Sequence, residues 1–204
     1  MIALVDYGLG NIHAFVNIYK SLNIPVVVAD NAEKLDRADH VILPGVGAFD
    51  WAMAKLNDSG MRSLLDDMVL VRKIPVLGVC VGMQMMAHRS DEGEMSGLGW
   101  IGGEVKKFDE ATFTQQTHLP HMGWNNVIPQ HAYGLFAEMA NNPLFYFLHT
   151  YYFSPANPVE SLALTDYNGM FASAVGSGNV FGMQFHPEKS HRAGTQLLKN
   201  FANL

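Results

Sequence analysis

The chain has 204 residues, of which 49% are hydrophobic and 16% are charged, and its formal net charge is −6. This length and apolar content suit a single globular domain, residues 1–204, with a full hydrophobic core. The acidic balance and the lack of any run of Lys and Arg argue against a nucleic-acid-binding surface, because neutralising phosphates needs clustered cations.

The first half of the chain alternates short apolar runs with stretches of helical pattern. The pattern predicts strands at 1–5, 25–29, 40–43 and 75–79, helices at 8–22 and 81–90, one or two helices over 49–71, and a short charged connection at 32–38. Continuous runs of Val, Ile and Leu between helices are typical of a parallel sheet that is buried on both faces. We therefore predict a doubly wound α/β fold, with a mostly parallel central sheet, helices on both faces and right-handed crossovers.

The second half has apolar segments that are separated by turns instead of helices. Strands are predicted at 100–108, 124–128, 145–152, 162–166, 172–175 and 180–184, and a helix at 191–203. We expect these strands to be antiparallel or mixed additions to the same sheet. No linker, repeat or low-complexity tract suggests a domain boundary.

Cys80 lies in the segment Gly78-Val79-Cys80-Val81-Gly82, between a predicted strand and a predicted helix. A side chain on such a tight turn is pushed out of the backbone, and the residues two positions away crowd the turn, so that glycine fits there. This is the G-x-nucleophile-x-G elbow, with Cys in place of Ser. Free N–H groups at the start of a helix favour a thiolate and can donate to an oxyanion. A buried structural cysteine is the alternative interpretation.

His186 ends another apolar strand, in the segment Phe185-His186-Pro187-Glu188. Pro187 ends the strand pairing and fixes the turn that follows. Glu188 can fold back onto the imidazole, fix its tautomer and stabilise its charged form, which leaves the other ring nitrogen for the thiol. The sequence therefore predicts a triad of Cys80, His186 and Glu188 for nucleophilic attack on an amide.

A glycine-containing loop, Pro44-Gly45-Val46-Gly47, follows a strand that should lie near the Cys80 strand. Glycine allows backbone amides to point into a cavity without obstruction by a Cβ atom. This loop can therefore supply an oxyanion donor beside the N–H of Val81. An ordinary turn between a strand and a helix would have a similar sequence.

Neither export nor a bound metal is expected. The start of the chain, MIALVDYG, lacks the basic segment and cleavage site of a signal peptide, and no apolar run approaches the roughly 18 residues of a membrane span. With one cysteine and no disulfide, a cytoplasmic protein is the simplest expectation. The pairs His118 and His121, or His186 and His191, lack further ligands at a zinc spacing, so we expect no metal or other cofactor.

Three motifs, in this order and spacing, resemble the class I (triad-type) glutamine amidotransferases. They are Pro-Gly-Val-Gly at 44–47, Gly-x-Cys-x-Gly-Met-Gln at 78–84 and Phe-His-Pro-Glu-Lys-Ser at 185–190. The similarity covers nearly the whole chain. The segments at 6–11, 97–99, 119–125 and 147–152 point to the glutaminase subunits of histidine biosynthesis within that family.

This resemblance implies a fold, a reaction and a substrate site. Cys80 is expected to attack the side-chain amide of L-glutamine while His186 protonates the departing ammonia, and water then hydrolyses the γ-glutamyl thioester. The residues expected to bind the α-amino and α-carboxylate groups of glutamine are Gly47, Gln84, Thr150 and Tyr151.

The resemblance also implies a heterodimer with a (β/α)₈-barrel cyclase subunit that uses the ammonia. The residues expected at or near that interface are Asn11, His121, Trp124 and Lys189. Hydrolysis is expected to be slow until the partner binds its own ligand. Trp124 and His121 could instead pack in the core, and Lys189 could be a solvated charge.

Two departures from the family pattern keep the choice of partner open. Val81 stands where leucine is commoner in the family, and Thr150 stands where serine is usual, although its hydroxyl is kept. These departures do not exclude related subunits whose barrel partner amidinates a nucleotide-linked sugar. Two further hypotheses are a stand-alone cysteine hydrolase, which would turn over peptides or folates without a partner, and a non-catalytic regulatory protein.

Overall fold

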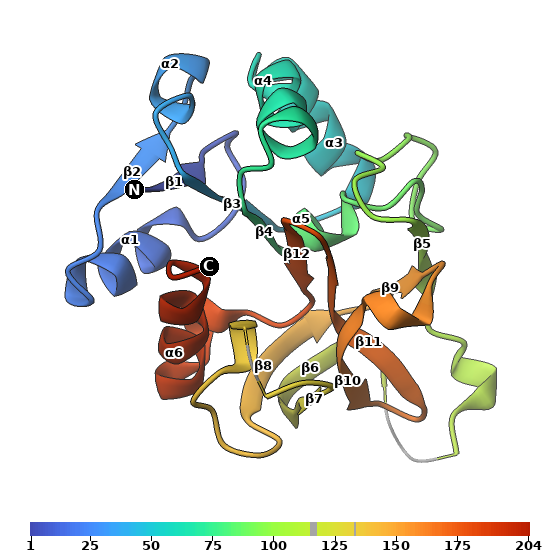
Figure 1. Ribbon diagram of the computed structural model, residues 1–204. Coiled ribbons are helices and arrows are strands. Elements are labelled where there is room, and N and C mark those ends of the chain that lie inside the picture. Colours follow the sequence, from blue (N-terminus) through green and yellow to red (C-terminus); the bar gives the residue numbers. More distant parts are fainter. Residues whose placement is uncertain (115–117, 133) are drawn as a thin grey trace.

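The computed structural model describes residues 1–114, 118–132 and 134–204, and its main feature is an eight-stranded sheet (Figure 1). The strand order is β2-β1-β3-β4-β12-β11-β10-β7. The strands from β2 to β12 in this order are parallel, and β11, β10 and β7 are antiparallel to their neighbours. Their bounds are β1 (Ile2–Val5), β2 (Val26–Ala29), β3 (His40–Gly45), β4 (Val76–Cys80), β7 (Ile128–Pro129), β10 (Ser161–Asp166), β11 (Met170–Ser177) and β12 (Val180–Met183).

Helices cover both faces of the parallel strands. The longer helices are α1 (Ile12–Ser21), α3 (Phe49–Asp58) and α6 (His191–Phe201), and the short ones are α2 (Ala32–Leu35), α4 (Arg62–Asp66) and α5 (Val81–Gln84). A π-helical turn, η1 (Asp67–Val71), extends α4, and 3-10 turns form η2 (Glu110–Thr112), η3 (Gly134–Phe136), η4 (Pro158–Glu160) and η5 (Pro187–Lys189). In Figure 1, α1 and α6 lie on one side of the sheet and α3 and α4 on the other. Among the described residues, no helix is long and apolar enough to cross a membrane.

The central strands are buried because both of their faces are covered. Every residue of β1 and β4 is buried, as the continuous apolar runs of these segments predict. The chain runs from β1 to β2 on one side and then returns past β1 to β3 on the other. In such sheets the crevice beyond the carboxyl ends of the strands is the usual binding site. The predicted doubly wound α/β fold is confirmed.

Two ribbons lie outside this sheet, contrary to the expectation that all later strands extend it. One ribbon pairs β5 (Gly103–Lys107) with β9 (Tyr151–Pro155), and the other pairs β6 (His121–Asn126) with β8 (Leu144–His149). The strand predicted at 145–152 is therefore two strands, because the chain bends at Thr150 and changes partners. This bend lies beside the carboxyl end of β4, since the Cys80 sulfur contacts the Leu148 carbonyl and Gln84 Nε2 donates to the Tyr151 carbonyl.

Other predicted boundaries were also wrong. The strand predicted at 124–128 falls across β6 and β7, and the strand predicted at 100–108 begins at Gly103. The helix predicted at 81–90 ends at Gln84, because the carbonyls of Met85 and Met86 accept hydrogen bonds from the N–H groups of Leu98 and Ile101 instead of from a following helical turn. The helix predicted from residue 8 begins at Ile12, after two glycines with positive φ. The strand predicted at 40–43 continues to Gly45, so half of the predicted oxyanion loop is paired strand.

Candidate active site

Cys80 is the last residue of β4 and has the strained backbone angles φ 55° and ψ −113°. These angles are rare for a residue with a side chain, and they turn the Cys80 side chain out of the strand. The flanking glycines are required by close packing: a Cβ atom on Gly82 would lie 1.9 Å from the carbonyl oxygen of Leu43, and one on Gly78 would lie 2.7 Å from that of Gly82. The structure therefore has the predicted nucleophile elbow.

His186 reaches the elbow because β12 lies beside β4 in parallel register. After β12 the chain crosses to the β6–β8 ribbon, where the His186 N–H donates to the Tyr146 carbonyl at 2.8 Å. The turn η5 then returns Glu188 to the ring, and its Oε1 lies 2.9 Å from His186 Nδ1. The other carboxylate oxygen of Glu188 is buried and has no hydrogen-bond partner among the described residues. The hydrogen bond to the His186 imidazole thus provides the main stabilisation of the buried Glu188 carboxylate.

The electrostatics of this pair favour a charged imidazole. Burial lowers the pKa of His186, but hydrogen bonding and charge interactions with Cys80 and Glu188 outweigh burial and raise its pKa to about 9. His186 is therefore an imidazolium at neutral pH and can donate a proton to a leaving group. The sulfur of Cys80 also lies 3.9 Å from the Leu148 carbonyl and 3.7 Å from Gln184 Nε2.

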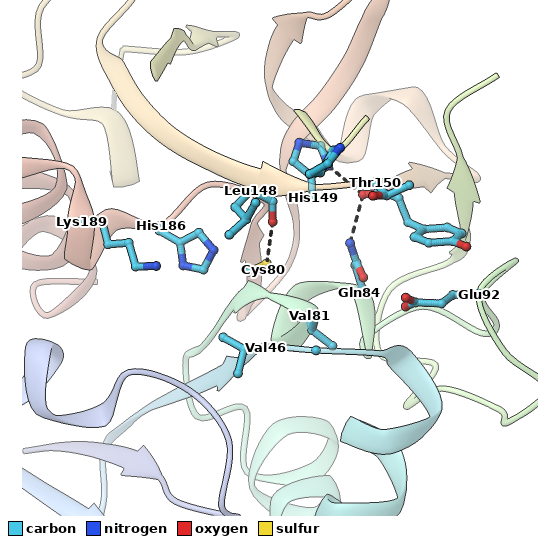
Figure 2. Close-up of a pocket in the computed structure, with 13 residues that line it drawn as sticks. Val46, Cys80, Val81, Gln84, Glu92, Leu148, His149, Thr150, His186 and Lys189 are labelled. Atoms are coloured by element: carbon cyan, nitrogen blue, oxygen red, sulfur yellow. Dashed lines mark hydrogen bonds between the residues drawn. The ribbon is translucent and has the colours of Figure 1, made fainter. Parts of the chain in front are cut away.

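Cys80 and His186 open onto one cavity of about 280 Å³ (Figure 2). The other described residues that line it are Val46, Gly47, Val81, Gln84, Glu92, Pro120, Leu148, His149, Thr150, Tyr151 and Lys189. In Figure 2, Lys189 and Glu92 lie at opposite ends of this cavity, with Cys80 and Gln84 between them. The sequence-predicted triad and substrate residues are thus brought together, although they come from distant segments.

Gln84 and the bend at Thr150 are held by hydrogen bonds. Gln84 Nε2 donates to the Tyr151 carbonyl at 3.1 Å and to Gln184 Oε1 at 3.0 Å. The Tyr151 carbonyl also accepts a hydrogen bond of 2.8 Å from His149 Nδ1. The bend between β8 and β9 is therefore fixed from two sides.

The end of β3 lies directly beside the nucleophile, since Gly45 is the register partner of Cys80. A Cβ atom on Gly45 would lie 2.4 Å from the backbone nitrogen of Gly82, so the two segments touch. The Tyr7 hydroxyl donates to the Pro44 carbonyl at 2.7 Å and holds this strand from the other side. Val46 and Gly47, which follow, reach the cavity wall. The predicted oxyanion residues Val46, Gly47 and Val81 thus line the same cavity as Cys80, and Gly45 lies beside Cys80 in the sheet.

Three polar residues of the site were not singled out from the sequence. Glu92 lies in a loop, and one of its oxygens accepts a hydrogen bond of 2.9 Å from the N–H of Phe49, at the start of α3. Its position has no local sequence signal, because the loop folds back from a distant segment. Gln184 is two residues before His186, and this spacing along a strand was a usable signal. His149 precedes the predicted Thr150 and Tyr151 directly.

The residues expected at a partner interface differ in their exposure to solvent. Asn11 and Lys189 are exposed, and Trp124 is 45% exposed, with its ring stacked on His191 at 5.1 Å. His121 is 3% exposed, and its ring lies beneath the surface, on the same strand as Trp124.

Comparison with known proteins agrees with this geometry. The family model described as glutamine amidotransferase class-I matches residues 3–204, so the chain belongs to that family of enzymes. It is 54% identical to the imidazole glycerol phosphate synthase subunit HisH of Bdellovibrio bacteriovorus and 48% identical to that of Leptospira interrogans, each over 100% of both chains.

Solved structures support the same fold. A crystal structure of a glutamine amidotransferase superposes with a TM-score of 0.76 at 18% identity, covering 100% of this chain and 99% of that one. A glutamine amidotransferase from Thermotoga maritima superposes with a TM-score of 0.63 at 18% identity, covering 99% of this chain and 82% of that one.

Proposed function

We propose that this protein is the glutaminase subunit of an imidazole glycerol phosphate synthase and hydrolyses L-glutamine to glutamate and ammonia. The observation that carries the proposal is the strained Cys80 elbow, whose sulfur shares a cavity with the buried His186–Glu188 pair. The full-length identity of 54% to a relative of that name favours this assignment over an amidotransferase for sugar modification.

The reaction follows from the charged imidazolium form of His186. The Cys80 thiolate attacks the side-chain amide carbon of glutamine, and the oxyanion that forms accepts hydrogen bonds from the Val81 N–H and from the end of β3. His186 gives its proton to the amide nitrogen, which leaves as ammonia. The γ-glutamyl thioester is then attacked by water, which gives a proton to the neutral His186. Glutamate leaves and the Cys80–His186 pair is restored.

The cavity has complementary ends for an amino acid. Glu92 is anchored through one oxygen to the Phe49 N–H, which leaves its second oxygen for the α-ammonium group of glutamine. Gln84 lies between Glu92 and Cys80 in Figure 2, and Thr150 and Tyr151 line the same cavity, where the Thr150 hydroxyl can donate a hydrogen bond to the α-carboxylate. Glutamine therefore fits with its amide at Cys80 and its charged end near Glu92.

The outer face of the β6–β8 ribbon is suited to a partner protein. Met122 is 66% exposed, Trp124 45%, Leu144 46% and Leu148 39%, while alternate residues of both strands point into the core. Met122 is the register partner of Leu148, so the exposed apolar side chains form one continuous patch. Such a patch beside an active site is typical of a protein interface.

The expected partner is a (β/α)₈-barrel cyclase subunit that consumes the ammonia. Lys189 lies at the edge of the patch, with Nζ 5.7 Å from the centre of the Tyr146 ring. Asn11 follows Gly10, which lies so close to Pro44 that a Cβ atom on Gly10 would be 2.7 Å from the Pro44 Cβ. These polar side chains can form a rim around the apolar patch and orient the partner over the cavity.

The proposal is tested by glutamate release from glutamine, with and without the cognate cyclase subunit. Replacement of Cys80 by Ser should abolish glutamine-dependent synthesis by the complex and leave ammonia-dependent synthesis intact, because only the first needs the nucleophile. Val159, 84% exposed and not part of the cavity lining, offers a control: Val159→Ala should change neither activity. Wild-type protein that releases no glutamate in the complex would overturn the assignment.

A further inference from the structure

Two buried histidines form a pair between the active-site cavity and the outer part of the β6–β8 ribbon. His121 on β6 and His149 at the end of β8 are register partners, and His121 Nδ1 lies 2.9 Å from His149 Nε2. Their exposed fractions are 3% and 6%. Neither ring takes part in the bond-making steps of glutamine hydrolysis, so their burial in a polar contact needs another explanation.

The proton positions in this pair follow from its neighbours. His149 Nδ1 faces the Tyr151 carbonyl at 2.8 Å, which can only accept, so Nδ1 carries the hydrogen and Nε2 carries the lone pair. His121 Nδ1 must then donate to His149, which leaves His121 Nε2 to accept from Asn125 Nδ2 at 3.2 Å. Both rings are therefore neutral and both carry hydrogen on Nδ1.

Burial supports the neutral state of both rings. It lowers the pKa of His121 to about 4. Burial and the neighbouring His121 lower the pKa of His149 to about 3. A second proton on His149 would also put two N–H groups face to face, because His121 Nδ1 already donates to it.

The rings have little freedom to turn. His121 is stacked between Phe147, with ring centres 4.6 Å apart, and Tyr167, with ring centres 3.9 Å apart. Asn125, the outer donor, is fixed in turn, because its amide also donates to the Asp166 carbonyl at 2.9 Å and its oxygen accepts from the Asn126 N–H at 2.8 Å. The direction of every hydrogen bond from Asn125 to Tyr151 is thus determined.

The far end of this row is the substrate-binding bend. The Tyr151 carbonyl accepts from His149 on one side and from Gln84 on the other, and Gln84 bonds to Gln184, which contacts the Cys80 sulfur. An unbroken row of hydrogen bonds therefore joins the ribbon to the nucleophile through the bend. Loss of the His121 contact would free His149 to turn and release one of the two bonds that fix Tyr151.

We infer that His121 is a positioning residue for glutamine binding, which acts through His149 to hold the Thr150–Tyr151 bend in its binding orientation. The inference rests on the proposed glutaminase function only for its kinetic consequence. The row of hydrogen bonds itself is a property of the fold and has its own test.

The kinetic test replaces His121 by Phe and by Asn. His121→Phe keeps the stacked ring but removes both nitrogens, so the KM for glutamine should rise about tenfold, the effect of one lost hydrogen bond, while kcat changes less than about threefold. His121→Asn puts an amide nitrogen where Nδ1 was, and its KM should return to within about threefold of wild type. His88→Phe, at an exposed histidine outside the cavity lining, should leave both constants unchanged.

The test of the row itself is a long-range ¹H–¹⁵N spectrum of the histidine rings at neutral pH. Both His121 and His149 should appear as neutral rings with hydrogen on Nδ1, and His121→Phe should move the His149 signals. A charged ring, or hydrogen on Nε2 of either residue, overturns the inference even if the protein proves not to be a glutaminase. An active His121→Phe protein with wild-type KM, or a His121→Asn protein as impaired as His121→Phe, also overturns it. If His121→Phe does not fold, Asn125→Leu removes the outer donor and should raise KM in the same direction.

Discussion

Replacement of Glu188 by glutamine measures how much the buried carboxylate contributes to catalysis. Glutamine has nearly the same shape, and its amide oxygen can still accept the hydrogen bond from His186 Nδ1, now 2.9 Å from Oε1. The negative charge is lost, and solvent cannot replace it because the Glu188 side chain is 2% exposed. A hydrogen bond to a charged group contributes about 1.5 to 3 kcal/mol, so kcat should fall about 10- to 150-fold.

The same substitution should shift the pH dependence of the reaction. The wild-type rate should decline as pH rises through about 9, where the His186 imidazolium loses its proton. Without Glu188, the interaction with Cys80 alone opposes burial, and this alkaline limb should move down by about one pH unit or more. The assay is glutamate release by the complex from about pH 6 to pH 10, with Glu33→Gln, an exposed residue, as the control. An unmoved alkaline limb, or a kcat within twofold of wild type, would refute this account of the triad.

Four further outcomes are expected. Gly82→Ala should lower the free energy of unfolding by about 3 kcal/mol or more in urea titrations, because its methyl group would lie 1.9 Å from a carbonyl oxygen of β3. Glu92→Gln should raise the KM for glutamine about 10- to 100-fold with a small effect on kcat, and an unchanged KM would remove Glu92 from the substrate site. Tyr7→Phe leaves the buried Pro44 carbonyl without its donor and should cost about 1 to 3 kcal/mol of stability. Folding raises the pKa of His186 from 6.5 to about 9. The charge of His186 therefore contributes fully to stability below pH 6.5, and this contribution disappears as pH rises through 9. The difference in unfolding free energy between wild type and His186→Asn should shrink across that interval.

The parallel half of the fold was predictable because its strands are buried on both faces. Continuous apolar runs that stand between helical segments, such as those of β1 and β4, indicate buried parallel strands. The Cys80 elbow was equally visible, since the glycines are imposed by contacts within a few residues of the turn and by the strand beside it. Features that depend on a few neighbouring residues, such as the buried strands and the elbow, could thus be predicted from the sequence.

The ribbons and part of the cavity could not be derived in this way. The bend at Thr150 divides an apolar segment whose pattern predicts one strand. The first half, β8, pairs with β6 and the second half, β9, pairs with β5, and long-range contacts decide these partners. Glu92 reaches the cavity only because its loop binds the start of α3. The length of the helix after Cys80 was overestimated because the carbonyls of Met85 and Met86 accept from a distant loop instead of from a further helical turn.

The contact between the Cys80 sulfur and the Leu148 carbonyl has a consequence for the fate of the product. Leu148 lines the cavity through which Cys80 is reached, and it is 39% exposed, as one of the apolar residues of the patch. Leu148 therefore belongs both to the surroundings of the reacting sulfur and to the patch where the cyclase is expected to dock. Ammonia formed at Cys80 is thus released beside the surface that the cyclase is expected to cover, so a partner seated on this patch would also control whether ammonia escapes to water.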